Sequence, residues 1–393
     1  MSLLLGGANA IMSQTLIETF GLSSTALGLM SSAYLMTFGF MQFPLGVMLD
    51  RYGARTSLAP LLLFAVAGSL LFGVAQNTAH LVAARALLGV GLAGCTMAAF
   101  KCYADWLPAE RLPVAYSLQT FAGGLGAMAA TRPLALLFER VPWRGVFAAF
   151  ALAVFAIALA VWRVVPEKSR LGAAAERSSF AAQFAVMLGF LADRRFWYIA
   201  PLAAAMQGVL YAYLNLWLGP WLRDVAAVSG AGVGNLLFFS AAGAAAGYLL
   251  NGAAANLLAA KGWLTWEGFY LSIGAAFTLL LGLISLGVPG AQYLWPPVIF
   301  FAAASMISFP LMRTLFGEAE VGRVLSLLNF LIFFASFVMQ WFVGAVLDLF
   351  PAPDAGFAPT GYTVGLWVLT AVNAVAVAFF VLRLWRTKRG SDF

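Results

Sequence analysis

The sequence is poor in charged residues. Only 9% of its 393 residues are charged and 63% are hydrophobic, whereas a soluble domain usually carries about 25% charged residues. A soluble fold of this size could not remove so much apolar surface from water, so the composition indicates a membrane protein with many spans. In such a protein the net charge of +7 reflects Lys and Arg retained on the cytoplasmic side and does not indicate nucleic-acid binding.

Reactive side chains are also scarce. The two cysteines, Cys95 and Cys102, share one apolar segment and do not indicate a disulfide framework. The single histidine, His80, falls in a predicted outer loop, where a surface role suits it better than a proton relay. The sequence contains no Cys/His cluster, no phosphate-binding Gly-Lys-Ser/Thr loop and no nucleophile beside a base. We therefore expect no enzyme, no cofactor and no metal site, and we disfavour ATP-driven pumping.

Apolar segments long enough to form spanning helices, which need roughly 20 residues, fill most of the chain. The first begins at Met1 without a polar leader or the basic region of a signal peptide. We expect that its cytoplasmic half is missing; the alternative is a short, tilted first helix. The predicted spans are twelve: 1–17, 25–48, 56–75, 79–102, 113–138, 144–165, 196–218, 231–254, 264–287, 293–315, 322–348 and 364–385.

A polar stretch divides these spans into two sets of six. It carries apolar residues at helical spacing, from Phe180 to Leu191, which predicts an amphipathic helix on the cytoplasmic surface. Placing both termini in the cytoplasm puts most Lys and Arg on the inner side. The expected organisation is an N-terminal six-helix bundle at 1–165, the linker at 166–195, a C-terminal six-helix bundle at 196–385 and a cytoplasmic tail at 386–393.

The two halves resemble each other weakly. Residues 252–262 follow the eighth span as residues 46–55 follow the second, and 324–327 begin the eleventh span as 115–118 begin the fifth, at nearly the same offset. Two related halves suit a transporter that rocks around a site at the bilayer midplane. The alternative is chance similarity between apolar helices.

A short charged segment, residues 46–55, joins the second and third spans. Its glycines allow a tight turn and close backbone approach. A carboxylate at a helix end can also face the positive N-terminus of another helix. The alternative is a loop that only fixes topology. The positions concerned are Gly46, Asp50, Arg51, Gly53 and Arg55.

This segment resembles the signature loop of the major facilitator superfamily, Gly-x-Leu-x-Asp-Arg-x-Gly-x-Arg, with Met48 where Leu is usual. Arg85 and Gly89 are similar to the family's fourth-helix Arg motif. The resemblance implies an all-α fold of two pseudo-symmetric six-helix bundles. It also implies that Asp50 contacts the start of the eleventh span near 322–323 and latches the cytoplasmic side shut. Asn256 replaces the Asp in the second copy, so a latch there is weaker or absent.

Polar residues inside spans are costly and tend to face a cavity or one another. Several fall at helical spacing on one face of a span, which predicts a central cavity between the two bundles. The alternative is interhelical hydrogen bonding that only holds helices together. The candidate cavity residues are Tyr34, Gln42, Gln119, Arg132, Gln207, Tyr211, Asn215, Asn329 and Gln340, and Asn9 and Ser13 add polar groups to the first span.

The charges inside the spans bear on the substrate. Arg85 and Arg132 are embedded, although Arg132 can instead snorkel to the outer interface, and no Asp or Glu lies mid-span. This pattern favours an anionic solute such as an organic acid or a phosphate ester. The family's antiporter signature has Gly-Pro followed by paired glycines, whereas residues 123–126 here precede Pro133, which disfavours drug efflux.

We therefore expect a secondary active transporter, a symporter or an antiporter, that moves a small polar solute by alternating access. The expected solute is an organic anion, with a proton gradient as the default driving force. The alternatives are an efflux antiporter for hydrophobic compounds and a non-transporting membrane sensor with the same fold. The expected partners are a small-molecule substrate and the lipid bilayer. We expect a monomer in the inner (plasma) membrane.

Overall fold

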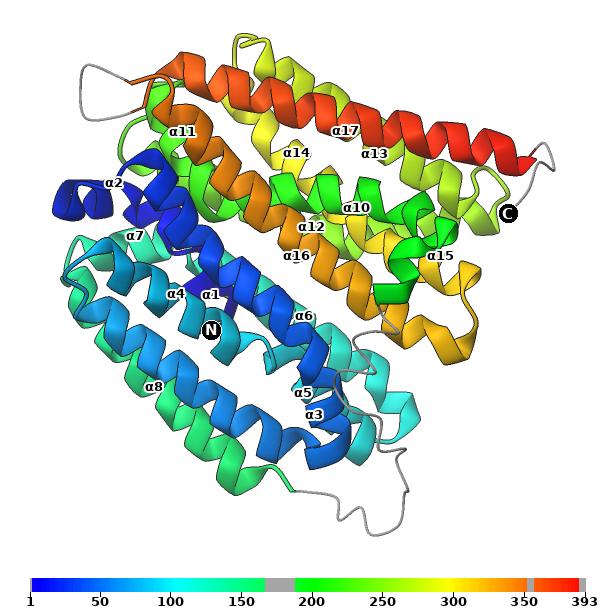
Figure 1. Ribbon diagram of the computed structural model, residues 1–393, viewed down its shortest axis with the longest axis horizontal. Helices are drawn as coiled ribbons and strands as arrows, with labels where there is room; N and C mark the ends of the chain where they lie inside the picture. Colours follow the sequence, from blue (N-terminus) through cyan, green and yellow to red (C-terminus); the bar gives the residue numbers. More distant parts are fainter. Residues whose placement is uncertain (1, 167–187, 352–356, 389–393) are drawn as a thin grey trace.

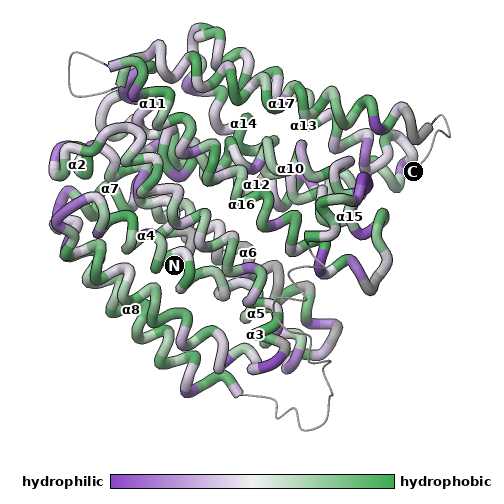
Figure 2. Tube along the Cα trace, viewed as in Figure 1, coloured by the Kyte–Doolittle hydropathy of each residue, from purple (hydrophilic) through white to green (hydrophobic). Residues whose placement is uncertain are grey.

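The computed structural model describes residues 2–166, 188–351 and 357–388, and its regular elements there are all helices (Figure 1). Two helical bundles lie side by side, α1 to α8 in one and α10 to α17 in the other. Figure 2 shows apolar residues along the lengths of the helices and hydrophilic ones gathered toward their ends, as a bilayer requires. The predicted all-α fold of two bundles is confirmed.

The first bundle contains the signature segment and the fourth-helix motif. Its second and third spans form one continuous helical element in which only Gly53 leaves helical geometry, with φ 84° and ψ 173°. The expected loop is thus reduced to a single turn at the glycine that can adopt a positive φ. The elements are α1 (Ser2–Gly7), α2 (Asn9–Phe20), α3 (Ser24–Gly73), α4 (Thr78–Leu92), α5 (Cys95–Trp106), α6 (Leu112–Ala129), α7 (Arg132–Phe138) and α8 (Trp143–Val164).

The second bundle contains two spans with irregular turns in their middle. A π-helical turn, η3 (Tyr213–Trp217), interrupts the seventh span, and a 3₁₀ segment, η5 (Ala303–Ile307), interrupts the tenth. The helices are α10 (Arg194–Ala212), α11 (Leu218–Asp224), α12 (Ala231–Ala260), α13 (Trp266–Ser285), α14 (Trp295–Ala302), α15 (Ser308–Leu315), α16 (Glu318–Asp348) and α17 (Pro359–Lys388).

The predicted spans match these helices closely. In the described part of the chain ten helices are long and apolar enough to cross a membrane, and α6 with α7, bent by 41°, makes an eleventh. The predicted first span is two short helices, α1 and α2, that meet at Ala8. Pro133 at the start of α7 explains the break in the fifth span, because proline cannot donate to the preceding turn. The predicted linker helix falls mostly on residues 167–187, outside the described residues.

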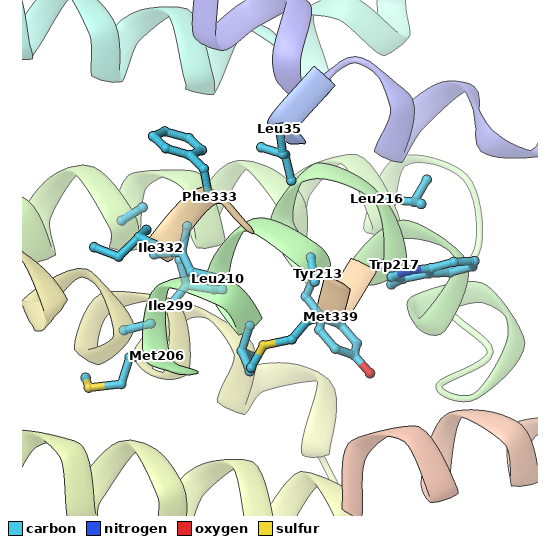
Figure 3. Packing of buried hydrophobic residues seen from close by; sticks show 14 of the residues in the cluster. Leu35, Met206, Leu210, Tyr213, Leu216, Trp217, Ile299, Ile332, Phe333 and Met339 are labelled. Atoms are coloured by element: carbon cyan, nitrogen blue, oxygen red, sulfur yellow. The ribbon is translucent and has the colours of Figure 1, made fainter. Parts of the chain in front are cut away.

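The two bundles pack through α3 of the first and α16 of the second. Figure 3 shows Leu35, Phe333 and Met339 from these helices around Tyr213 and Trp217 of the π-helical turn. Glycine permits the closest backbone approach: a Cβ on Gly344 would lie 2.4 Å from the carbonyl oxygen of Ser24. The interface between the halves is therefore tightly packed at the Ser24 end of α3.

Candidate functional site

Arg85 is one of the largest fully buried side chains, with 1% of its surface exposed. Its Nη1 donates to the carbonyl oxygen of Leu5 at 2.7 Å and its Nη2 to that of Gly6 at 3.0 Å. These carbonyls belong to the last turn of α1, where the helix dipole is negative. The guanidinium also lies 5.3 Å from the ring centre of Tyr34. Arg85 thus attaches the broken first span to α3 and α4.

The charge of Arg85 is not neutralised by a carboxylate within the described residues. In the same residues its Nε has no hydrogen-bond partner. An unpaired buried cation is expensive in a membrane and marks a functional position by default. The guanidinium that holds α1 therefore keeps one buried N–H donor without a partner and a net positive charge where α1, α3 and α4 meet.

A second polar group joins the two bundles. Ser31 Oγ on α3 accepts from Asn9 Nδ2 and from Gln340 Nε2, each at 2.7 Å. The backbone oxygen of Gln340 accepts from Trp217 Nε1 at 2.8 Å. We call Asn9, Ser31 and Gln340 the bridging cluster, because the first two belong to one bundle and Gln340 to the other.

A row of aromatic rings crosses the interface from Arg85 into the second bundle. Tyr34 lies 5.7 Å from Phe38, Phe38 lies 4.7 Å from Phe333, and Phe333 stacks on Tyr211 at 5.5 Å with an angle of 13° between the rings. The predicted cavity candidates Tyr34 and Tyr211 thus stand at the two ends of one aromatic path. Both residues reach this row because α3 and α10 each pack on α16.

The row ends at a buried polar group within the second bundle. Gln207 Nε2 donates to the hydroxyl of Tyr248 at 2.8 Å, and Ser305 Oγ donates to Gln207 Oε1. The hydroxyls of Tyr211 and Tyr248 are also hydrogen-bonded. Both the amide nitrogen and the amide oxygen of Gln207 are therefore hydrogen-bonded. Such bonding suits a role in holding helices together as well as contact with a substrate. The sequence interpretation missed Tyr248 and Ser305, although a lone Tyr in the Ala- and Gly-rich α12 was a usable signal.

Gln207, Tyr211 and Asn215 fall at i, i+4 and i+8, which predicts one polar stripe on the seventh span, but they do not share one face. Gln207 and Tyr211 face the second bundle, whereas Asn215 Oδ1 lies 3.9 Å from the position a Cβ on Gly7 of α1 would take. The π-helical turn at Tyr213–Trp217 widens the helix and rotates Asn215 away from the i, i+4, i+8 line. The prediction of a single stripe was wrong for this reason.

The remaining candidate cavity residues make separate contacts. Gln42 Nε2 donates to its own helix at the Phe38 oxygen, 3.4 Å away, and Gln119 Oε1 accepts from Tyr103 at 3.1 Å. Arg132 begins α7 and packs against Gly234 of α12, while Asn329 is half-buried on α16. Their place in a cavity stays a prediction.

The signature segment lies in the middle of α3, around the break at Gly53. Arg51 packs on Tyr52, and Arg55 lies 4.7 Å from the ring of Trp162 on α8. A Cβ on Gly46 would meet nothing within 4 Å. The side chain of Asp50 lies outside the described residues, so its predicted contact near Gly322 and Arg323 stays a prediction.

A different inter-bundle contact is described at the Ser24 end. Asp348, the last residue of α16, accepts hydrogen bonds from the backbone N–H groups of Ser24 at 2.8 Å and Thr25 at 2.9 Å. These are the first amides of α3, so the carboxylate caps the positive end of a helix in the other bundle. Arg223 Nη2 donates to Ser13 Oγ at 2.9 Å across the same interface.

The chain matches a family model described as Major Facilitator Superfamily over residues 1–340. A crystal structure of a bacterial homologue of the human lysosomal transporter Spinster, inward-facing and occupied, is similar, with a TM-score of 0.72 and 17% identity over 97% of this chain and 93% of that one. The nucleoside transporter NupG has a TM-score of 0.72 and 13% identity over 96% of each chain. The D-xylose-proton symporter has a TM-score of 0.66 and 17% identity over 96% and 94%.

One curated relative matches part of the chain. The nitrate/nitrite transporter NrtP from Picosynechococcus sp. is 27% identical over 146 residues, which are 37% of this chain and 24% of that protein. The chain therefore aligns with about a quarter of the length of this relative. The structural likenesses, all below 25% identity, establish the fold alone.

Proposed function

The chain belongs to the major facilitator superfamily, and from this premise we propose that it is a secondary active transporter for a small organic anion. It is a multi-pass membrane protein with transporter relatives of several substrate classes. We place it in the inner (plasma) membrane with both termini in the cytoplasm, and we assign a proton gradient as its driving force. Transport proceeds by alternating access of a site between the two bundles.

The observation that carries the anion assignment is the buried, uncompensated charge of Arg85. Its Nε–H is free among the described residues, and no carboxylate there neutralises it. In a low-dielectric site such a cation attracts a negative group much more strongly than in water. An anion that reaches Arg85 also meets Tyr34, the first ring of the aromatic row. A neutral solute would leave the buried charge unpaired.

Arg85 also provides a physical link between the substrate and the first span. The same guanidinium that offers Nε–H holds the carbonyls of Leu5 and Gly6. Any anion that shifts Arg85 therefore shifts the end of α1 as well. This supports a site whose occupation changes how the first bundle packs against the second.

The transport assignment is tested by uptake into liposomes that contain the purified protein. With an imposed pH gradient, labelled organic acids and phosphate esters are compared with inorganic nitrate and with neutral sugars. We expect gradient-dependent uptake of at least one organic anion and background uptake of sugars. Uptake of a neutral sugar alone, or no uptake of any solute by folded protein, would contradict the proposal.

Two carboxylates are expected to act in opposite directions on the conformational equilibrium. With cytoplasmic termini, the Asp348 contact closes the outer side, and the predicted Asp50 contact closes the inner side. Asp348→Asn should favour the state open at the Ser24 end by roughly fivefold, about 1 kcal/mol, the scale of a charge at a helix terminus. Asp50→Asn should favour the opposite state and slow exchange without abolishing binding.

The equilibrium is read by electron spin resonance distances between labels on Thr19→Cys and Leu349→Cys, both exposed at the Ser24 end, in a variant without Cys95 and Cys102. Asp348→Asn should lengthen this distance and Asp50→Asn should not. Asp224→Asn is the matched control, because Asp224 accepts only from Tyr362 and Phe357 of its own bundle among the described contacts. Equal effects of the Asp348 and Asp224 variants would refute the outer latch.

A further inference from the structure

The bridging cluster of Asn9, Ser31 and Gln340 is short of a hydrogen-bond donor. All three side chains are at least 98% buried. Within the described residues Asn9 Oδ1 and Gln340 Oε1 have no partner. Buried polar atoms are nearly always paired, so an unpaired atom calls for an explanation.

Exchanging the oxygen and nitrogen positions of the two side-chain amides does not supply the missing hydrogen-bond donor. Ser31 Oγ can accept from both amides, as the structure has it, or donate its one proton to a single amide oxygen. At most one of the two amides can therefore direct its oxygen at Ser31. In either orientation of the amides at least one buried amide oxygen remains without a donor, because Ser31 has a single proton to donate.

The cluster lies about one turn along α3 from Tyr34, whose ring contacts the Arg85 guanidinium. Ser31 is three residues before Tyr34 on α3, and Asn9 is three residues after Gly6, whose carbonyl Arg85 holds. Three residues advance a helix by roughly 4.5 Å. The cationic donor and the unpaired acceptors thus lie on adjoining turns of the first span and of α3.

We propose, building on the anion transport proposed above, that the substrate is a carboxylate that also carries an O–H or N–H donor, as in a hydroxy acid or an amino acid. Its carboxylate pairs with Arg85 Nε, and its donor is accepted by Asn9 Oδ1 or Gln340 Oε1. Because Asn9 and Ser31 belong to one bundle and Gln340 to the other, the donor of the substrate contacts both halves. The bridging cluster then discriminates between substrates and senses occupation.

A site built around buried acceptors rejects an analogue that lacks the matching donor, since its polar atoms stay unpaired. The test is competition for binding to the purified, full-length protein by three matched pairs: lactate and propionate, 3-hydroxybutyrate and butyrate, malate and succinate. Alanine is included as the amino analogue of lactate. We expect the hydroxylated or aminated member of at least one pair to bind about tenfold or more tightly.

The variants Asn9→Leu and Gln340→Met keep the side-chain size and remove the acceptors. Each should reduce the preference for the donor-bearing member of a pair toward one, because the unpaired acceptor that sets the preference is gone. Asn373→Leu is the matched control. Among the described residues Asn373 is also a fully buried amide with an unpaired oxygen, but it bonds only its own helix, α17. Thermal melting confirms that each variant is folded before binding is compared.

Three results would overturn the inference while the anion assignment stands. The first is that both members of every pair bind equally well while binding still requires Arg85. The second is that the preference for the donor-bearing member survives both Asn9→Leu and Gln340→Met. The third is that the protein takes up a phosphate ester and binds no carboxylate. Equal binding would mean that the cluster holds only water. Failure of every anion to bind to folded protein would overturn both proposals.

Discussion

Arg85→Gln is expected to reduce the uptake rate of the organic anion by about 100-fold while the protein remains folded in the membrane. The substitution removes the buried positive charge and the Nε–H donor that we assign to the substrate. Hydrogen bonds to charged groups contribute roughly 1.5–3 kcal/mol each, and about 2.7 kcal/mol corresponds to 100-fold. Uptake at limiting substrate, normalised to protein in the liposomes, measures the effect.

A structural contribution of Arg85 must be separated from this loss. The same substitution leaves the carbonyls of Leu5 and Gly6 without their donor, so the melting temperature should also fall. Arg85→Lys keeps the charge but cannot reach both carbonyls with a planar fork, and should keep partial uptake.

Arg144→Gln is the control for the backbone contacts of Arg85, at an exposed position. Arg144 likewise donates to two backbone oxygens, those of Gly73 and Ala75, and packs on the ring of Trp143. It has these contacts at the turn between α3 and α4, away from the aromatic row and the bridging cluster. Its replacement should leave uptake nearly unchanged. Equal losses for the two variants would show that Arg85 acts only through the fold.

Gly89→Val is expected to prevent accumulation of folded protein. A Cβ at this position would lie 2.1 Å from Thr37 Oγ1 and 2.4 Å from the carbonyl oxygen of Tyr34. The second of these atoms is backbone, so α3 and α4 would have to separate. Overpacking usually costs about 1–3 kcal/mol, and a forced separation of two helices costs more. Separation would also move Arg85 away from Tyr34.

The measurement is the yield of monodisperse protein after detergent extraction, followed by its melting temperature. Gly252→Ala in α12 is the control, because a Cβ there meets nothing within 4 Å and alanine favours a helix by up to about 1 kcal/mol over glycine. Normal yield and melting of Gly89→Val would contradict the close approach of α3 and α4.

The spans could be predicted because they depend on length and polarity alone, and the two-bundle fold followed from the resemblance of residues 46–55 to the family's signature loop. A helix that crosses the bilayer needs a long apolar run, and the chain offers such runs with few charges between them. The glycine of the fourth-helix motif was also predictable, since Gly89 lies one turn after Arg85 and meets α3 directly.

The partners within the site could not be predicted, because they are set by local breaks in the helices. The break at Ala8 places the Leu5 and Gly6 carbonyls opposite Arg85. The Gly6-Gly7 pair signals a break in the helix but not which side chain the freed carbonyls meet. The π-helical turn before Leu218 similarly separates Asn215 from Gln207. Periodicity assumes an unbroken helix and fails where a turn widens.

The most direct test of the central claim is counterflow without any imposed gradient. Liposomes with wild-type protein are loaded with an unlabelled organic acid identified by uptake and then diluted into a trace of the labelled acid. Alternating access through the Arg85 site predicts transient accumulation of label by wild-type and Arg144→Gln protein, and none by Arg85→Gln protein. An equal transient with Arg85→Gln, or a wild-type protein that exchanges only neutral solutes, would contradict the account.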